Sequence, residues 1–202
     1  MKKIIRLIGI HGHAGVGKDT VASYLEQSKK DTYIEAFADP LKSACAALFG
    51  IPLDSFYDEE EKEIVDPFWG VSPRQMAQFV GTELIRNHLG KLFDNEDNGR
   101  LFWVRHLQAR LDGDLQESSS GNYTDWDTVI ICDVRFQEEY DWIIESNGKV
   151  IHLTRPGYEG KVGLDNHSSE QSINLHAKEV TYEVENNGTL DDLYAKIDAI
   201  VF

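Results

Sequence analysis

Residues 4–20 read IIRLIGIHGHAGVGKDT, and this stretch decides the fold. Its first part, from Ile4 to Ile10, is a short apolar run of the kind that forms a buried strand in a parallel sheet. A glycine-rich turn follows, and from Asp19 onward the apolar residues recur at helical spacing. A strand, a glycine-rich turn and a helix in that order predict an α/β protein with its ligand site at the end of this strand.

The glycine-rich turn fits the G-x-x-x-x-G-K pattern of a phosphate-binding loop, in the strand-to-helix context that this pattern requires. Glycines let amide N–H groups turn inward around phosphate oxygens, and the helix N-terminus adds a positive partial charge. The Lys18 ammonium is expected to contact the β- and γ-phosphates. The residues expected to bind ATP are Gly12, His13, Ala14, Gly15, Val16, Gly17, Lys18, Asp19 and Thr20.

Two carboxylates are candidates for handling a magnesium ion. Asp19 occupies the position where a Ser or Thr usually reaches Mg²⁺. It either holds the ion through water or is only an acidic residue at a helix start, with the metal held mainly by phosphates. Asp133 follows the apolar run 128–132, so it is expected at the ligand edge of the sheet, where it can orient metal-bound water or receive a proton. Arg135, two residues later, can clamp a phosphate bidentately.

The rest of the chain alternates strands and helices, which predicts a three-layer P-loop NTPase fold with a mostly parallel central sheet and helices on both faces. Residues 54–66 and 112–127 are expected to be exposed loops. Further strands are expected at 33–37, 128–132, 149–154 and 180–184, and further helices at about 40–49, 72–89, 100–111, 137–146 and 189–200. Gly50 and Gly90 are expected to end two of these helices.

Composition limits the function. The 202 residues suit a single domain with one core, and the formal net charge of −15 argues against binding a nucleic acid polymer, which needs many Lys and Arg contacts. No apolar run approaches a membrane span, and the start of the chain lacks a secretion-signal pattern. Cys45 and Cys132 stand alone in apolar surroundings, and neither has metal-ligand spacing. Two isolated cysteines of this kind favour a reducing cytoplasm.

Taken together, the motifs resemble the phage-type deoxynucleoside monophosphate kinases over almost the whole chain. The matching segments are residues 12–20, 37–42 (FADPLK), 72–75 (SPRQ), 81–83 (GTE) with Arg86, 133–136 (DVRF), 155–157 (RPG), 167–170 (HSSE) and 186–189 (NNGT). The resemblance implies ATP as donor, Mg²⁺ as cofactor and a deoxynucleoside monophosphate as acceptor. It also implies one kinase domain over residues 1–202, an acceptor-binding insertion at about 40–111 and a lid at about 155–172.

The resemblance also suggests roles for individual residues. Lys18, Asp133, Arg135 and Arg155 are expected to be catalytic, and the acceptor is expected to contact Asp39, Lys42, Trp69, Arg74, Gln75, Gln78, Thr82 and Arg86. Helical spacing puts Arg74 and Gln78 on the same face of the predicted helix. It does the same for Gln75, Gln78 and Thr82, and for Thr82 and Arg86. Trp69 is a candidate for stacking on the acceptor base, whereas Trp103 is expected in the core.

Several alternatives stay open at this point. The segments at 37–42 and 186–189 also resemble dephospho-coenzyme A kinase and phosphomevalonate kinase relatives, and an ATP-binding regulatory module is a third hypothesis. Between Pro156 and Lys178 there is no arginine, so the lid is expected to be short, with Arg155 as its main phosphate contact. The resemblance implies a phage source and hence the host cytoplasm, and leaves a homodimer open.

Overall fold

The computed structural model describes residues 6–92, 96–113, 127–158 and 173–200. The chain divides into two compact units, one formed by residues 1–36 with 109–202 and the other by residues 37–108. Most of the predicted loop at 112–127 and most of the predicted lid lie outside the described residues.

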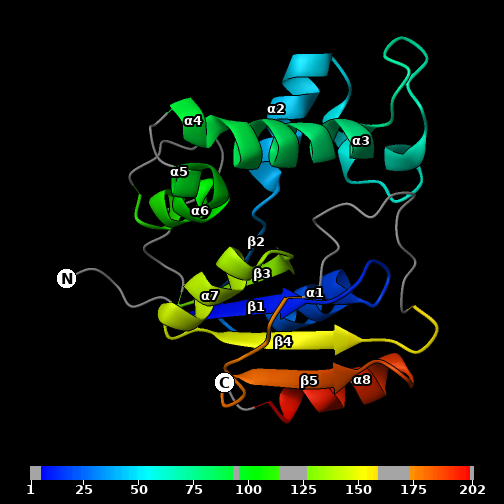
Figure 1. Ribbon diagram of the computed structural model, residues 1–202. Coiled ribbons are helices and arrows are strands. Elements are labelled where there is room, and N and C mark those ends of the chain that lie inside the picture. Colours follow the sequence, from blue (N-terminus) through cyan, green and yellow to red (C-terminus); the bar gives the residue numbers. More distant parts are fainter. Residues whose placement is uncertain (1–5, 93–95, 114–126, 159–172, 201–202) are drawn as a thin grey trace. The chain divides into compact units, whose positions relative to one another are not determined.

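The first unit contains a five-stranded sheet in the order β2-β3-β1-β4-β5, in which every neighbouring pair is parallel (Figure 1). Its strands are β1 (Arg6–His11), β2 (Thr32–Glu35), β3 (Thr128–Val134), β4 (Lys149–Thr154) and β5 (Thr181–Glu185). The predicted parallel sheet is therefore confirmed. The second strand is shorter than predicted, because the chain passes into the second unit at Phe37.

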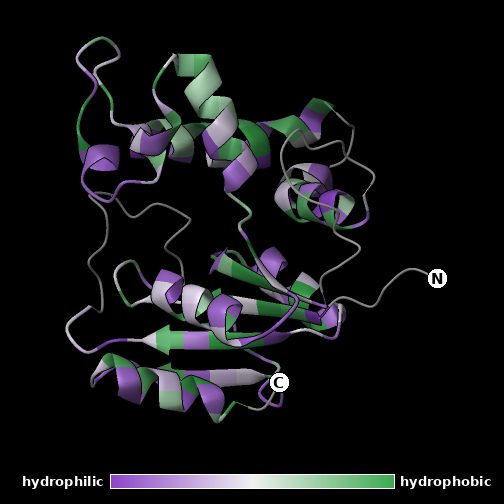
Figure 2. Cartoon of the chain, turned by 180° about the vertical axis from the view of Figure 1, so that it is seen from behind, coloured by the Kyte–Doolittle hydropathy of each residue, from purple (hydrophilic) through white to green (hydrophobic). Residues whose placement is uncertain are grey.

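Helices cover both faces of this sheet. On one face, α1 (Lys18–Ser28) and α8 (Leu190–Asp198) bury Leu25 and Ile197 in a core cluster that includes Ile8 and Ile10. Gly9, between those two isoleucines, faces the other way, since a Cβ there would lie 2.7 Å from Ile143 Cδ1 of α7 (Gln137–Glu145). The three layers agree with the predicted fold class. Figure 2 shows hydrophilic and hydrophobic residues alternating along α8, as expected for a helix with one buried side.

The second unit is helical. Its first helix, α2, ends at Gly50, which adopts the left-handed conformation with φ 67°, as the sequence predicted. The helical segments are α2 (Asp39–Phe49), η1 (Leu53–Phe56), η2 (Glu61–Glu63), α3 (Pro73–Gln78), η3 (Phe79–Leu89), α4 (Gly90–Leu92) and α5 (Glu96–Arg100), together with most of α6 (Phe102–Leu111).

The helix predicted at 72–89 starts as expected but changes character. Ser72 caps α3, yet from Phe79 the backbone follows the wider π-helical pattern, and Gly90 continues the helix instead of ending it. One carbonyl in this segment also makes a tertiary contact: the Trp103 indole N–H donates to the Gly81 carbonyl at 3.2 Å. Such a side-chain bond draws on an oxygen that an α-helix would use in its own ladder. The prediction of a regular α-helix over this whole range was therefore wrong.

Other expectations can be checked directly. Trp103 is buried in the core, as predicted, and the acidic run 58–61 is exposed. The helix predicted at about 100–111 is α6, and a short helix that was not predicted, α5, precedes it. Both cysteines are free thiols, and burial raises the pKa of the Cys45 thiol to about 11. Within the described residues, none of the helices combines the length and the apolar character needed to cross a bilayer.

Candidate active site

The phosphate-binding loop connects β1 to α1 at the carboxyl edge of the sheet. Gly12, Gly15 and Gly17 have φ values of 155°, 78° and 105°, a range that favours glycine. Packing adds a second requirement at Gly12, where a Cβ would lie 2.3 Å from the main-chain oxygen of Leu153 in β4. These positions therefore need glycine for both conformation and space.

Lys18 lies across its own loop. Its ammonium group donates to the carbonyl oxygens of Gly12 and His13, each at 2.8 Å. A loop with amide donors and a lysine ammonium suits an anionic phosphate chain, so the residues present fit the triphosphate of ATP.

The other loop residues differ in exposure. The Val16 side chain is buried in the core cluster, so only its main chain is available to a ligand. His13 and Ala14 are exposed, as is Asp19 in the first turn of α1, while Thr20 is half-buried.

A β-bulge in β3 lies beside the loop. Gly9 pairs with Ile131 but His11 pairs with Val134, so β3 carries one more residue than β1 across this interval. The His11 ring is held at 2.9 Å from the Val134 carbonyl, which can accept a hydrogen bond from Nδ1–H. Bulges of this kind re-aim side chains near active sites. The half-buried Asp133 sits within the bulge, at the ligand edge where the sequence placed it.

The imidazole rings of His11 in β1 and His152 in β4 favour the neutral form. Burial lowers the pKa of His11 to about 4, against the opposing effect of the hydrogen bond to the Val134 carbonyl, and the Lys18 ammonium acts in the same direction as burial. Burial also lowers the pKa of His152, whose ring stacks on His11 with 5.2 Å between centroids. The sequence analysis gave neither ring a role, because their contact depends on the pairing of β1 with β4.

Arg135 is fixed through its main chain by a residue that sequence reasoning missed. The buried Glu139 carboxylate accepts hydrogen bonds from the N–H groups of Arg135 and Phe136, at 2.8 and 3.0 Å. The Arg135 side chain is exposed. An acidic residue three positions after the start of a helix is a known capping signal, so Glu139 was recognisable in principle.

Arg155 follows β4 and lies over an aromatic ring. Its guanidinium is 4.6 Å from the centroid of the Tyr158 ring, and a Cβ at Gly15 would lie 2.8 Å from Tyr158 Cε1. Tyr158 therefore lies against the phosphate-binding loop, and it brings Arg155 near that loop. Tyr158 was not among the predicted site residues.

The strand order brings the predicted catalytic residues to one edge. β1 lies between β3 and β4, and all three strands run in the same direction. The loop carrying Lys18 is therefore flanked by the end of β3, with Asp133 and Arg135, and by the end of β4, followed by Arg155. No group of three or more His, Cys, Asp or Glu side chains suited to a metal ion occurs among the described residues.

In the second unit, Asp39 and Lys42 form a small cluster with Tyr57. The Tyr57 hydroxyl donates to Asp39 Oδ1 at 2.8 Å, and the Lys42 ammonium lies 3.5 Å from the same oxygen. The ammonium is also 3.8 Å from the centroid of the Tyr57 ring. Two predicted acceptor residues are thus close together, and Tyr57 was not foreseen.

The helix start at Ser72 carries further predicted acceptor residues. Arg74 forms an ion pair with Glu63, and Gln78 is half-buried. The Gln75 side-chain oxygen accepts from the N–H of Ser72 at 2.9 Å, so Gln75 completes a capping box. That Gln75 also contacts the acceptor stays a prediction.

The remaining acceptor candidates are engaged inside the unit. The Trp69 indole N–H donates to the Phe49 carbonyl at 2.9 Å, although 44% of this residue is exposed. Thr82 and Arg86 are buried, and Arg86 Nη1 donates to the Arg100 carbonyl at 2.9 Å. Arg86 therefore ties the π-helical segment to α5, and its contact with an acceptor stays a prediction.

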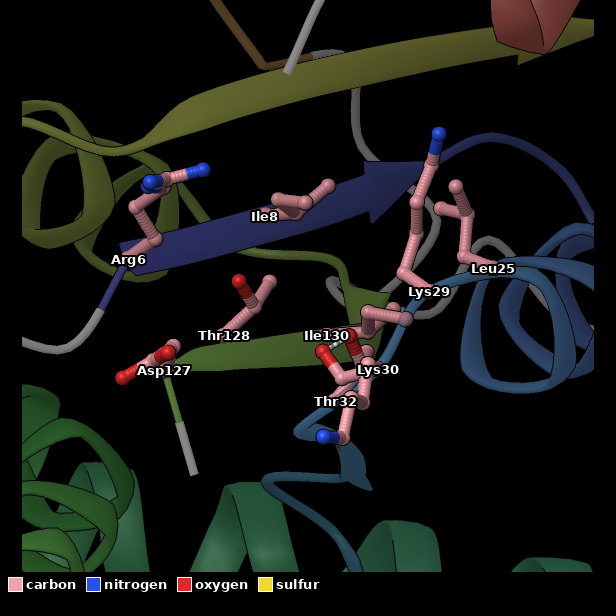
Figure 3. A pocket seen from close by; sticks show the side chains of 9 residues that line it. All are labelled: Arg6, Ile8, Leu25, Lys29, Lys30, Thr32, Asp127, Thr128 and Ile130. Carbon is pink, nitrogen blue, oxygen red and sulfur yellow. Dashed lines mark hydrogen bonds between the residues drawn. The ribbon is translucent and has the colours of Figure 1, made fainter. Parts of the chain in front are cut away.

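A hollow of about 200 Å³ lies elsewhere in the first unit (Figure 3). It is lined by residues at the beginnings of three strands, including Arg6, Thr32 and Thr128. These are the amino ends of the strands, whereas the phosphate-binding loop follows the carboxyl end of β1. The hollow is therefore separate from the candidate active site.

The family model described as deoxynucleotide monophosphate kinase matches residues 53–197. A protein of Acanthamoeba polyphaga mimivirus is 35% identical over 198 residues, covering 96% of this chain and 95% of its own length. The deoxynucleoside-5'-monophosphate kinase of Escherichia phage T5 is 24% identical, with 89% of each chain covered.

The deoxynucleotide monophosphate kinase of Enterobacteria phage T4 is 30% identical over 133 residues, which cover 66% of this chain but only 46% of the phage protein. The match therefore spans about half of that longer relative. Because the family model covers more than half of the chain and the mimivirus match spans almost all of it, the chain belongs to the deoxynucleotide monophosphate kinase family.

Proposed function

We propose that this protein transfers the γ-phosphate of ATP to a deoxynucleoside monophosphate, giving ADP and a deoxynucleoside diphosphate. The observation that carries the proposal is the position of the Lys18 loop between the ends of β3 and β4, which bear Asp133, Arg135 and Arg155. Phosphoryl transfer depends mainly on positioning and on positive charge around the transferring group. A phosphate cradle flanked by two arginines supplies both.

On the donor side, residues 12–20 hold the ATP phosphates, with Lys18 moving from its loop carbonyls to the β- and γ-phosphates. Arg135 and Arg155 stabilise the charge of the transferring group, and Asp133 receives or directs the acceptor's proton. Mg²⁺, when bound, would neutralise phosphate charge, and Asp19 and Asp133 would hold it through water. This weak protein coordination is in keeping with the small number of carboxylates that Mg²⁺ usually takes from proteins in such sites.

On the acceptor side, the second unit acts as the insertion expected at about 40–111. Lys42 and Arg74 provide positive charge for the acceptor phosphate, while Asp39 and Gln78 offer hydrogen bonds to its sugar or base. Trp69, Gln75, Thr82 and Arg86 complete the proposed acceptor set. Residues 155–172 act as a short lid within one kinase domain, and the enzyme works in the cytoplasm of the host cell if it is encoded by a phage.

The test is ADP release by the purified protein with ATP and Mg²⁺, measured for every deoxynucleoside monophosphate, every ribonucleoside monophosphate and dephospho-coenzyme A. We expect turnover with one or more deoxynucleoside monophosphates and none in the Lys18→Ala variant. Turnover of dephospho-coenzyme A without turnover of any deoxynucleoside monophosphate would overturn the proposal. ATP binding without turnover of any acceptor would favour a regulatory module instead.

A further inference from the structure

Asn186 connects two parts of the candidate active site. Its side-chain amide donates to the Val16 carbonyl in the phosphate-binding loop at 2.9 Å. Its main-chain N–H donates to the Thr154 carbonyl at 2.7 Å, directly before Arg155. One half-buried residue therefore touches both the donor loop and the segment that carries an arginine of the site.

The contact with the loop is closely fitted. A Cβ on Gly17, which has φ 105°, would lie 3.0 Å from Asn186 Nδ2. Glycine is therefore needed at this position both for its conformation and for the approach of the asparagine amide. Any larger residue at position 17 would displace the amide or the loop.

The segment around Asn186 is itself held in place. The Lys196 ammonium of α8 donates to the Glu185 carbonyl and to Asn187 Oδ1, both at 2.7 Å. A capping box between Thr189 and Asp192 fixes the start of α8 just beyond. These bonds give Asn186 a rigid base from which to hold the loop.

The geometry of the peptide bond gives this contact a consequence for phosphate binding. In a trans peptide the C=O and the following N–H point in opposite directions. Because the Val16 carbonyl is turned toward Asn186, the Gly17 N–H is turned away from it. Holding that one carbonyl therefore fixes the direction of an amide donor in the loop.

We propose that Asn186 is a positioning residue that fixes the orientation of the Val16–Gly17 peptide and keeps the loop in register with Arg155. The inference rests on the proposed function for its kinetic consequence, since Arg155 matters only if a phosphoryl group is transferred. The amide is required as a donor. An aspartate of the same shape would place a negative oxygen against the Val16 carbonyl and repel it.

The test compares Asn186→Asp and Asn186→Ala with wild type, using Asn174→Asp as the matched control. Asn174 is exposed, and its hydrogen bonds to Gln137 run through its main chain. Thermal unfolding of each variant is measured first. At pH 8 we expect Asn186→Asp to weaken binding of a non-hydrolysable ATP analogue at least tenfold and to lower kcat at least tenfold, with the acceptor KM within twofold of wild type.

A pH series distinguishes the loss of the hydrogen-bond donor at position 186 from a general loosening of the phosphate-binding loop. A protonated aspartate can donate to the Val16 carbonyl again, so the activity of Asn186→Asp relative to wild type should recover several-fold from pH 8 to pH 4, where about half of an aspartate with an ordinary pKa is protonated. Asn186→Ala should show no recovery. A flat ratio for Asn186→Asp, or analogue binding within twofold of wild type in both variants, would overturn the inference.

Failure of the proposed function gives a different result. If wild type binds the ATP analogue but turns over no deoxynucleoside monophosphate, the proposed function fails, and weaker analogue binding by Asn186→Asp still supports the role of Asn186. If Asn186→Asp does not fold, Asn186→Ala decides by the same binding measurement.

Discussion

Replacing Glu139 tests whether one buried carboxylate holds Arg135 in place. Glu139 is 2% exposed and accepts hydrogen bonds from two main-chain N–H groups, those of Arg135 and Phe136. Leaving a buried donor unpaired costs about 1–3 kcal/mol. Because two donors lose their acceptor and water at the exposed Arg135 offsets only part of that loss, we expect Glu139→Ala to lower the free energy of unfolding by about 2–4 kcal/mol.

The loss should appear in both stability and catalysis. For a chain of this size, that free energy corresponds to a fall of about 5–15 °C in Tm. Glu139→Gln keeps an oxygen acceptor but loses its charge, so its cost should be about 1–2 kcal/mol. Since Arg135 loses its main-chain anchor, kcat should fall roughly ten- to hundredfold in Glu139→Ala, with little change in the KM for ATP.

The assay is urea unfolding followed by circular dichroism, with kinetics at a temperature where every variant is folded. Glu145→Ala is the matched control, because Glu145 is exposed on the same helix. Its free energy of unfolding should stay within about 0.5 kcal/mol of wild type. A Glu139→Ala variant that also stays within that limit, and keeps its turnover, would refute the reasoning.

Three further predictions follow from the contacts described above. Lys18→Ala should abolish measurable turnover while Tm changes little, because the two hydrogen bonds of its ammonium described above go to carbonyl oxygens of its own loop; wild-type turnover in the ADP-release assay would contradict this. Arg74→Ala should raise the acceptor KM and leave ATP binding intact, and a loss of ATP affinity by calorimetry would reverse the assignment. The pKa of His11 is about 4 in the folded chain and ordinarily 6.5, so the unfolded chain binds more protons between these values and stability falls as pH drops through this window. The stability advantage of wild type over His11→Asn should therefore shrink by up to roughly 3 kcal/mol between pH 7 and pH 4, and a constant difference in urea unfolding would contradict this.

The phosphate-binding loop could be predicted from sequence because its chemistry is local. Glycine positions, the lysine and the flanking strand and helix are all encoded within residues 4–28. The parallel sheet could be predicted for a similar reason, since its three central strands contain short apolar runs. The bulge at Asp133 could not, because it depends on the register between β1 and β3, which are far apart in the sequence.

The structure of the second unit was harder to predict because it also involves contacts between separate segments of the chain. In the π-helical segment, the Gly81 carbonyl accepts from the Trp103 indole, and the buried Arg86 donates to the Arg100 carbonyl, so both contacts involve residues outside the segment. Helical spacing assigns neighbours on one helix but does not say which face other helices will cover. The acceptor residues named from spacing and resemblance therefore remain predictions, whereas the capping role of Gln75 follows from geometry at the helix start.

The central position of β1 has a consequence for synthesis of the chain. β1 leaves the ribosome first, yet its two neighbours in the sheet begin only at Thr128 and Lys149. At roughly 5–20 residues per second, the first of these neighbours is made several seconds to tens of seconds later. During that interval both edges of an apolar strand lack their partners, so the nascent protein has to avoid aggregation until the second half of its sheet arrives.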